Sequence, residues 1–322
     1  MRRIGSLNWR TKQSSNGRWT TNNWDQLRIK RGSLITRATR EGCKRAWPKF
    51  CPLLPHEPRT FDQTHKIIVG LAGLQASLDD RDIQFERLND SQVRIAVRYA
   101  INELNGFAPW LTDLAAQRPE IVRDVFSESV RGEWQYSAEL QHPYAVMHDL
   151  VWHGNEIARL INDEVLTLPN ISDPPNYWIL RYALFLLLNQ KNPSIEQIAR
   201  IADQRLSQYS VGEPKWLLWM SKWLQVDANS AISALQAELG NNPKPDQMMV
   251  SLCSSLSGRY DEGLPQHPHQ SYLAPTALRS LVPLVYRYVP PANDIDRSGT
   301  GIYSPEDRDD AQEFRSGLLS LE

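Results

Sequence analysis

Apolar residues recur at helical spacing from residue 61 onward. Ile67, Leu71, Leu74 and Leu78 are separated by four, three and four positions, which places them on one face of a helix. No convincing run alternates apolar and polar residues beside a hairpin dipeptide, the pattern typical of strands. The hydrophobic pattern therefore predicts an all-α protein.

Residues that start and stop helices divide this pattern. Ser91 is placed to cap a helix, and Asn105-Gly106 tolerates the left-handed backbone of a helix end. Pro109 and Pro119 stand where first helical turns begin, because proline has no N–H to lose there. These signals predict helices at residues 91–104, 109–117 and 119–131.

The second half of the chain carries the same punctuation. Gly154 is expected to break a helical pattern, and residues 178–188 are apolar on most sides, which indicates a central helix. Ser194 and Gln197 have the spacing of a capping box. A polar stretch at 258–270 is read as a loop. Further helices are predicted at residues 194–208, 214–225, 228–239, 245–257, 274–288 and from Pro305, behind a Ser304 cap, to the end of the chain.

Short helices separated by proline and glycine favour a repeat array. Arg-Tyr-Ala occurs at residues 98–100 and again at 181–183, each time between aliphatic residues. Each helix pair has one face too apolar to remain in water, so neighbouring pairs must stack to cover it. We predict stacked antiparallel helix pairs, a HEAT-like α-solenoid, over residues 61–257. Residues 258–322 would continue this array through a loop and C-terminal helices, and the apolar pattern still running at the last residue suggests a truncated array.

Residues 1–60 differ from the rest of the chain. They hold 14 Lys and Arg against 3 Asp and Glu, although the whole chain has a net charge of −1. They lack a sustained period and end in four closely spaced prolines. A segment with apolar residues this scattered buries too little surface to offset its ordering entropy. We therefore predict an irregular, poorly ordered basic arm.

The basic arm suggests binding to nucleic acid. Its cations would neutralise phosphates, and Trp24 and Trp47 would stack on bases. A solvated tail, or residues added by a misplaced start codon, is the alternative. The candidate phosphate-binding residues are Arg28, Lys30, Arg31, Arg37, Arg40, Lys44 and Arg45.

Composition limits the class of protein. The chain has 322 residues, 41% apolar and 23% charged, as expected of a globular protein. Its three cysteines cannot form a closed set of disulfides, which favours a reducing cytoplasm. No apolar run reaches the length of a membrane span, and no export signal is visible, so no membrane is expected as a partner.

Three histidines and an Asp-rich segment are weak candidates for metal sites. His142, His148 and His153 lie close together, but a spacing of five turns the last two rings about 140° apart on a helix. Asp294, Asp296, Ser298 and Gly299 imitate the first half of a calcium loop, yet Pro305 occupies the position of its bidentate glutamate. Ordinary packing histidines and an Asx-rich loop are the favoured readings.

Motifs for nucleotide binding or nucleophilic catalysis do not occur in the sequence. There is no Gly-x-x-x-x-Gly-Lys phosphate loop, no Gly-x-Ser-x-Gly elbow, and no zinc spacing around Cys43 and Cys51. No catalytic, cofactor-binding or metal-ligating residue is therefore predicted. A hydrolase with a site assembled from dispersed Asp, Glu and His residues is the least supported alternative.

Tryptophans at helical spacing give a second candidate surface. Trp216, Trp219 and Trp223 share one helical face. Such a stripe is most often core or a helix–helix seam, and a partner-binding groove is the other interpretation.

The C-terminal half resembles the helical-repeat tail of large bacterial NACHT or STAND-type ATPases. The resemblance covers roughly residues 90–322. It rests on residues 223–228 with Ala231, Ile232 and Leu235, and on residues 278–286, 294–297, 303–305 and 308–312. It implies a helical sensor or scaffold that works with an ATPase module. This chain lacks that module, so the ATPase would be supplied by another chain.

Together these observations favour a non-catalytic helical-repeat module for recognition or scaffolding, such as the sensor part of a bacterial defence ATPase system. Its expected partner is a protein, with a P-loop ATPase chain as one candidate. Nucleic-acid binding through the basic arm is the main alternative. A steep fall of affinity with salt would separate the two, because phosphate neutralisation releases counterions.

Overall fold

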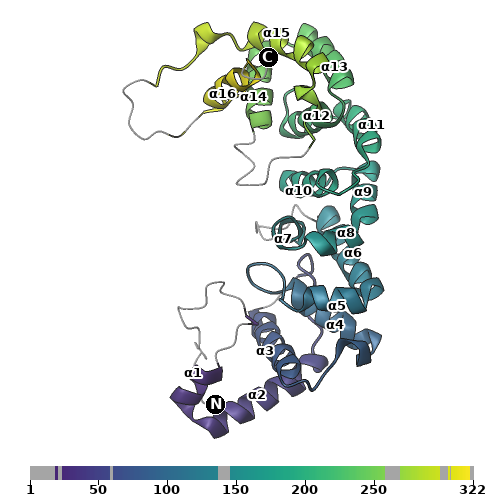
Figure 1. Ribbon diagram of the computed structural model, residues 1–322, viewed down its shortest axis with the longest axis vertical. Helices are drawn as coiled ribbons and strands as arrows, with labels where there is room; N and C mark the ends of the chain where they lie inside the picture. The colour runs from purple at the N-terminus through teal and green to yellow at the C-terminus, as the bar shows by residue number, and fades with distance from the viewer. Residues whose placement is uncertain are drawn as a thin grey trace. The chain divides into compact units, whose positions relative to one another are not determined.

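The computed structural model describes residues 19–20, 24–58, 61–136, 146–257, 269–297, 304 and 306–319. Every regular element in these residues is a helix, and no strand occurs among them (Figure 1). The all-α prediction is confirmed for this part of the chain. The molecule divides into two compact units, residues 1–183 and residues 184–322. The division falls inside helix α10 (Tyr177–Leu188).

In the first unit, α6 (Pro119–Tyr136) is the central helix. It packs against five neighbours, α4, α5, α7, α8 and α9, and its Val122, Phe126 and Val130 are fully buried. The other helices of this unit are α1 (Trp24–Arg31), α2 (Ser33–Ala46), α3 (Phe61–Asp79), α4 (Asp90–Ile101), α5 (Leu111–Gln117), α7 (Val146–His153), α8 (Asn155–Leu160) and α9 (Asn162–Ile171).

The prediction of an irregular arm is wrong for residues 24–46, which form α1 and α2. Helix α2 packs closely on α3 because small residues line the contact: a Cβ at Gly73 would lie only 2.0 Å from the Cys43 carbonyl oxygen. Burial of Leu27, Cys43 and Trp47 anchors the pair. The helical pattern of apolar residues in α1 and α2 is short, so neither helix would be stable alone. Contact with α3 supplies the stability that they lack.

Helix boundaries in the first unit follow the sequence signals in part. Asn105 and Gly106 do have left-handed backbone, with φ of 59° and 99°, but α4 already ends at Ile101 with Asn102 as its C-cap, so this pair turns the chain beyond the helix and does not stop it. Helix α4 is capped by Asn89 in a capping box with Gln92, not by Ser91. Gly154 separates α7 from α8, as expected.

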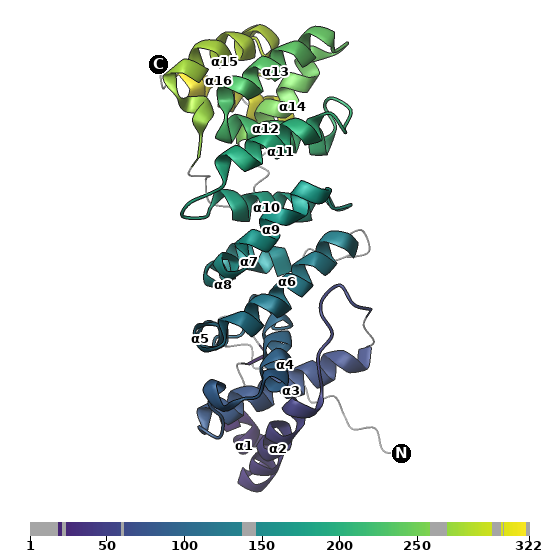
Figure 2. The same cartoon turned by 90° about the vertical axis from the view of Figure 1, so that its right-hand side faces the viewer.

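The second unit consists of six further helices, with α10 at its start. α12 packs on α14 and α14 on α16, while α13 packs on α15 (Figure 2). Consecutive helices also pack on each other from α11 to α16. These helices are α11 (Ile195–Leu206), α12 (Pro214–Val226), α13 (Ala228–Asn241), α14 (Pro245–Ser257), α15 (Pro275–Tyr288) and α16 (Asp307–Leu319).

Two local predictions for this unit have different outcomes. Residues 179–188 of α10 are buried on every side, as their continuous apolar pattern predicts. Ser194 occupies the N-cap of α11, but its side chain makes no capping hydrogen bond, so the capping box is wrong. None of the described helices is both long and apolar enough to cross a membrane.

Candidate functional site

Two of the predicted phosphate-binding residues face the protein instead of solvent. The Lys44 ammonium contacts Asp80 and lies 2.8 Å from Asp82, and Arg40 lies 2.9 Å from Asp80. The carboxylates beside Lys44 raise the pKa of that ammonium well above its usual range, and Lys44 lowers the pKa of Asp80. Arg40 and Lys44 therefore hold α2 against the C-terminal end of α3.

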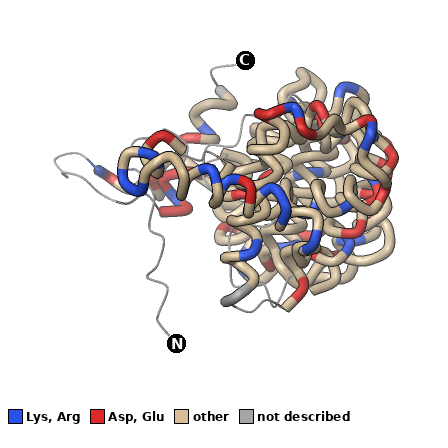
Figure 3. Tube along the Cα trace, turned by 90° about the horizontal axis from the view of Figure 1, so that it is seen from below, with Lys and Arg blue, Asp and Glu red and all other residues tan. Residues whose placement is uncertain are grey.

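The other predicted cations remain on the surface. Arg28 pairs with Asp25 at 3.2 Å, and both side chains are exposed. Lys30, Arg31, Arg37 and Arg45 are exposed and make no ion pair within the described residues. Lys and Arg are interspersed with Asp and Glu along the trace (Figure 3). The exposed basic surface on α1 and α2 therefore contains fewer cations than the sequence suggested.

The tryptophans expected to stack on bases are already engaged. Trp47 is only 3% exposed, and the Arg40 guanidinium lies 5.9 Å from the ring centroid of Trp24. Both rings contribute to the anchoring of α1 and α2. The described part of the basic surface thus offers charge with Trp47 buried, while Trp24 is half-buried beside Arg40.

The tryptophan stripe of α12 belongs to the core. Trp216, Trp219 and Trp223 are 1%, 0% and 6% exposed. The interpretation of these rings as a partner-binding surface is therefore wrong, and the core alternative is the observed one. Helix α12 packs on α11, α13 and α14, so neighbours cover its tryptophan face.

A surface groove lies in the first unit between the segment after α4 and the α7–α8 corner. Its volume is about 410 Å³, within the range of about 300–1,000 Å³ typical of ligand sites. The groove is lined by Phe107, Ala108, Pro109, Leu111, Thr112 and residues 151–157. Phe107, Leu111 and Ile157 are buried, while Thr112, Asn155 and Glu156 are exposed. Its accessible lining is therefore mostly polar, above apolar side chains that are themselves buried.

Two glycines allow the walls of this groove to approach each other. A Cβ at Gly106 would lie 2.6 Å from the His153 ring, and one at Gly154 would lie 2.7 Å from the Phe107 ring. Gly106 also has a φ of 99°, which side-chain-bearing residues rarely adopt. The helix-stop and helix-break signals of the sequence therefore also shape the groove.

An aromatic cluster continues from the groove along α7 to α10. Trp152, which is 37% exposed, lines the groove and packs against His148 with ring centroids 6.3 Å apart. The His148 ring packs edge-on against the Tyr182 ring with centroids 5.4 Å apart, and the Tyr182 and Trp178 centroids are 6.4 Å apart. The Arg181 guanidinium lies 5.2 Å from the Trp178 ring centroid. The cluster fixes the Trp152 ring at the groove.

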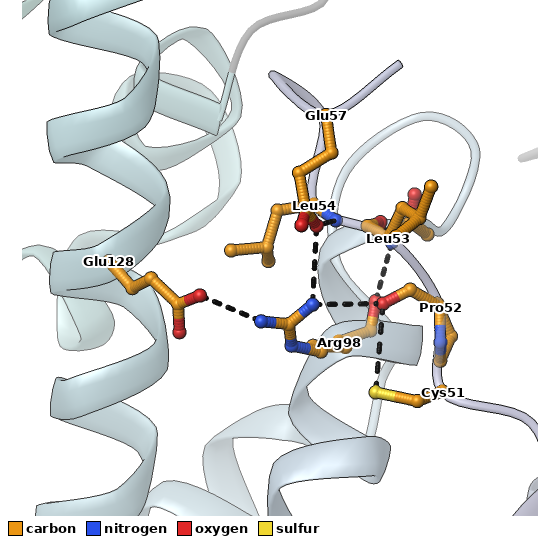
Figure 4. Close-up of polar contacts among 8 residues, drawn as sticks. Cys51, Pro52, Leu53, Leu54, Glu57, Arg98 and Glu128 are labelled. Atoms are coloured by element: carbon orange, nitrogen blue, oxygen red, sulfur yellow. Dashed lines mark hydrogen bonds and ion pairs between the residues drawn. The ribbon is translucent and has the colours of Figure 1, made fainter. Parts of the chain in front are cut away.

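A polar cluster around Arg98 stabilises the segment between α2 and α3 (Figure 4). The Arg98 guanidinium donates to the Pro52 carbonyl at 3.3 Å, to Glu57 at 3.3 Å and to Glu128 of α6 at 2.7 Å. Glu57 also accepts from the Leu54 amide at 2.5 Å. These contacts use the polar groups of the cluster for folding, so we do not consider it a candidate site.

The histidines and aspartates that suggested metal sites have protein partners. His148 Nδ1 lies 3.1 Å from the Asp149 carboxylate, and His153 lines the groove. Asp294 accepts two hydrogen bonds from Arg315, which lowers the pKa of this carboxyl. No group of three potential metal ligands occurs within the described ranges. His142, Ser298, Gly299 and Pro305 lie outside them.

Comparisons with known proteins add no assignment to this geometry. No protein-family model matches the chain, and no curated protein or solved structure shows significant similarity to it.

The groove is thus the candidate site that best fits a binding role. Reasoning from the sequence missed it, although two of its signals were visible. Gly154 marked a helix break and Asn105-Gly106 a left-handed turn. In the structure Gly106 lies against His153 and Gly154 against Phe107, at the walls of the groove. The two segments that form the groove, residues 107–112 and 151–157, lie about forty residues apart in the sequence. Helical periodicity shows which residues share one face of a helix, and it does not show contacts between distant segments.

Proposed function

We propose that this chain is a non-catalytic recognition module that binds an extended segment of a partner protein in the groove formed by residues 107–112 and 151–157. The observation that carries the proposal is the composition of the groove. Its accessible lining is mostly polar, with Thr112, Asn155 and Glu156 exposed above the buried Phe107, Leu111 and Ile157, which suits the backbone and polar side chains of an extended segment. Trp152 supplies a large, partly exposed ring beside these residues, and such rings often dominate binding energy.

The helix contacts support a helical-repeat scaffold for this module. In the second unit, α12, α14 and α16 form one row and α13 and α15 another. Helices two apart in sequence pack side by side in such rows when helix pairs stack, as in HEAT-like solenoids. We infer a solenoid of this kind, in which neighbouring helices cover the apolar faces and the loops and helix ends remain available for binding.

Binding of linear peptides tests the proposal. A library of random linear peptides is displayed on phage and selected on the immobilised full-length protein, and the enriched peptides are synthesised and labelled. We expect Trp152→Ala to weaken their binding at least about ten-fold, because the ring is lost from the groove wall. Tyr136→Ala is the matched control, since this ring is 46% exposed and lies outside the groove.

Two outcomes would refute the groove as the binding site. One is the absence of any peptide that binds the wild-type protein better than an unselected sequence. The other is equal binding to the wild type and to Trp152→Ala. Both variants lose some packing, Trp152→Ala against His148 and Tyr136→Ala against His56, so each should remain folded with a cooperative transition and a modestly lower denaturant midpoint. Binding is compared under conditions where all three proteins are folded.

A nucleic-acid role for the basic surface has less support. Arg40 and Lys44 are held by carboxylates, and Trp47 is buried. Binding to a labelled single-stranded oligonucleotide at increasing salt distinguishes this alternative. A steep linear fall of log affinity with log salt, reduced in Arg31→Ala and Arg37→Ala, would favour it.

The resemblance to the tails of STAND-type ATPases suggests the identity of a protein partner. We propose a P-loop ATPase chain as that partner, with this module as its sensor or scaffold. A P-loop ATPase gene beside this reading frame, and co-purification of the two products, would support the pairing. Co-purification that persists in Trp152→Ala would indicate a contact away from the groove.

A further inference from the structure

The corner between α1 and α2 exposes an unusual amount of aliphatic surface. Ile29, Leu34 and Ile35 are 76%, 81% and 51% exposed, among the largest values for apolar residues in the described chain. Lys30, Arg31 and Arg37 lie between and beside them. We call these six residues the α1–α2 corner. Single exposed aliphatic residues are common on proteins, whereas a cluster of three within seven positions indicates a contact surface.

The backbone of this corner is well defined. Gly32 has a φ of 84° and separates the two helices. Its amide donates to the Arg28 carbonyl at 2.8 Å, and its own carbonyl accepts from the Thr36 amide at 3.2 Å and from the Thr36 hydroxyl at 2.9 Å. The three exposed aliphatic residues therefore flank a hydrogen-bonded turn.

The other side of α2 shows which chemistry this helix recognises. There α2 contacts α3 with Cys43 against Gly73, and its Arg40 and Lys44 bind the carboxylates of Asp80 and Asp82 just beyond α3. A helix with an apolar face and acidic residues at its end thus already packs on α2. The α1–α2 corner presents the same combination of apolar and cationic groups, without such a neighbour among the described helices.

We propose that the α1–α2 corner docks an amphipathic helix of a partner protein, with an aliphatic face over Ile29, Leu34 and Ile35 and acidic residues opposite Lys30, Arg31 and Arg37. Charge complementarity identifies this occupant, because three cations without ion pairs border the aliphatic surface. The proposal shares with the proposed function the idea of a recognition module, but it uses a separate surface. Helix-in-groove recognition relies on the same anchors at helical spacing.

An anionic membrane fits this surface less well. Asp25 and Glu41 are exposed on the same helices, with side chains 79% and 48% accessible. Each pairs with a cation of its own helix, Asp25 with Arg28 and Glu41 with Lys44, both at 3.2 Å. These pairs reduce the positive charge that a flat anionic surface would contact.

Two synthetic peptides test the proposal on the full-length protein. Both are amphipathic helices with the same leucine face, one with glutamate flanks and one with lysine flanks, and fluorescence anisotropy measures their binding. We expect the glutamate-flanked peptide to bind at least about ten-fold tighter. Leu34→Ser/Ile35→Ser should weaken that binding about ten-fold or more, and Arg31→Glu/Arg37→Glu should remove the preference for glutamate. Ile171→Ser, which changes a residue of α9 that is 73% exposed, is the control and should bind normally.

Several results would overturn the proposal. These are equal binding of the two peptides, unchanged binding by the Leu34→Ser/Ile35→Ser variant, or preferential binding to vesicles of phosphatidylcholine with phosphatidylglycerol. Since the changed residues are exposed, every variant should keep the wild-type denaturant midpoint. Trp152→Ala separates the two proposals, because it should lose the groove peptides and still bind the glutamate-flanked helix.

Discussion

A single glycine determines how closely α2 approaches α3. A Cβ placed on Gly73 would lie 2.0 Å from the Cys43 carbonyl oxygen and 2.4 Å from its carbonyl carbon. Both are backbone atoms, so no side chain can rotate away and the helices must separate. We expect Gly73→Ala to lower the free energy of unfolding by about 2–3 kcal/mol, the cost of overpacking a tight contact. Denaturant unfolding measures this loss.

Gly42 provides the matched control within the same helix pair. It lies inside α2, where a Cβ would have no heavy atom within 4 Å. Gly42→Ala should therefore leave the packing unchanged and raise the free energy of unfolding by up to about 1 kcal/mol, because alanine loses less backbone entropy in a helix. Equal effects of the two substitutions would show that the α2–α3 approach is looser than the structure indicates.

At the scale of elements, ion pairs and hydrogen bonds accompany the apolar packing of α16 on its neighbours. Arg315, itself buried, binds both oxygens of Asp294 and donates to the Val289 carbonyl at 2.8 Å. Arg297 binds Asp309 through two nitrogens, at 3.0 and 2.7 Å. The Ser254 hydroxyl of α14 donates to Asp310 at 3.0 Å. These contacts tie α16 to α14 and to the segment after α15.

The Asp294–Arg315 pair predicts a dependence of stability on pH. Arg315 holds the pKa of Asp294 below its usual range, so the folded state binds this proton less readily than the unfolded state. The stabilisation is complete above the unfolded pKa, near 3.9, and is lost as pH falls through the lower folded pKa. Asp294→Asn should cost about 2–3 kcal/mol at neutral pH, because it leaves the buried Arg315 guanidinium without its anion.

Urea unfolding of wild type and Asp294→Asn at neutral pH and at about pH 3 measures this dependence. The difference between the two proteins should shrink as the pH falls. Lys44 also lowers the pKa of Asp80. The Asp294→Asn variant therefore keeps the part of the acid sensitivity that comes from Asp80. A difference that stays constant across this range would show that the Asp294 carboxylate does not stabilise the fold through its charge.

Helix positions were more predictable from the sequence than the contacts between helices. Pro214, Pro245 and Pro275 begin α12, α14 and α15, because a first-turn proline loses no hydrogen bond. Local patterns specify such starts. They do not specify which helix faces meet, so the arm at residues 24–46 was mistaken for irregular chain although Gly73 of α3 allows close packing on Cys43 of α2.

The candidate surfaces show the same limit. The Lys and Arg residues of the arm were visible in the sequence. Which of them pair with the carboxylates at the end of α3, and which stay exposed, depends on contacts between residues about forty positions apart. The tryptophan stripe of α12 was recognised, and only packing on its neighbours distinguishes core from surface. Periodicity reports that a face is apolar, and it does not report what covers that face.

At the scale of the whole molecule, the three cysteines report on its two compact units. Cys51 is exposed, whereas Cys43 of α2 is buried in the first unit and Cys253 of α14 in the second. Burial raises the pKa of the Cys43 thiol and raises that of Cys253 to about 12. Desolvation raises the pKa of the Cys51 thiol as well. Its exposure, not a larger thiolate fraction, should therefore let a thiol reagent at mildly alkaline pH modify Cys51 first, and the other two only when the local structure opens.

This difference allows the opening of each unit to be measured separately. Because the contacts that bury Cys43 lie in the first unit and those that bury Cys253 lie in the second, Gly73→Ala should raise the labelling rate of Cys43 at least about ten-fold and that of Cys253 much less. Mass spectrometry of peptides after timed labelling gives the two rates, and Cys51 in the same sample calibrates the reagent. Equal acceleration at Cys43 and Cys253 would mean that the chain opens as one cooperative body. Acceleration confined to Cys43 would mean that the two units open independently of each other. A partner bound at α1–α2 or at the groove would then stabilise the first unit without a matching effect on the second.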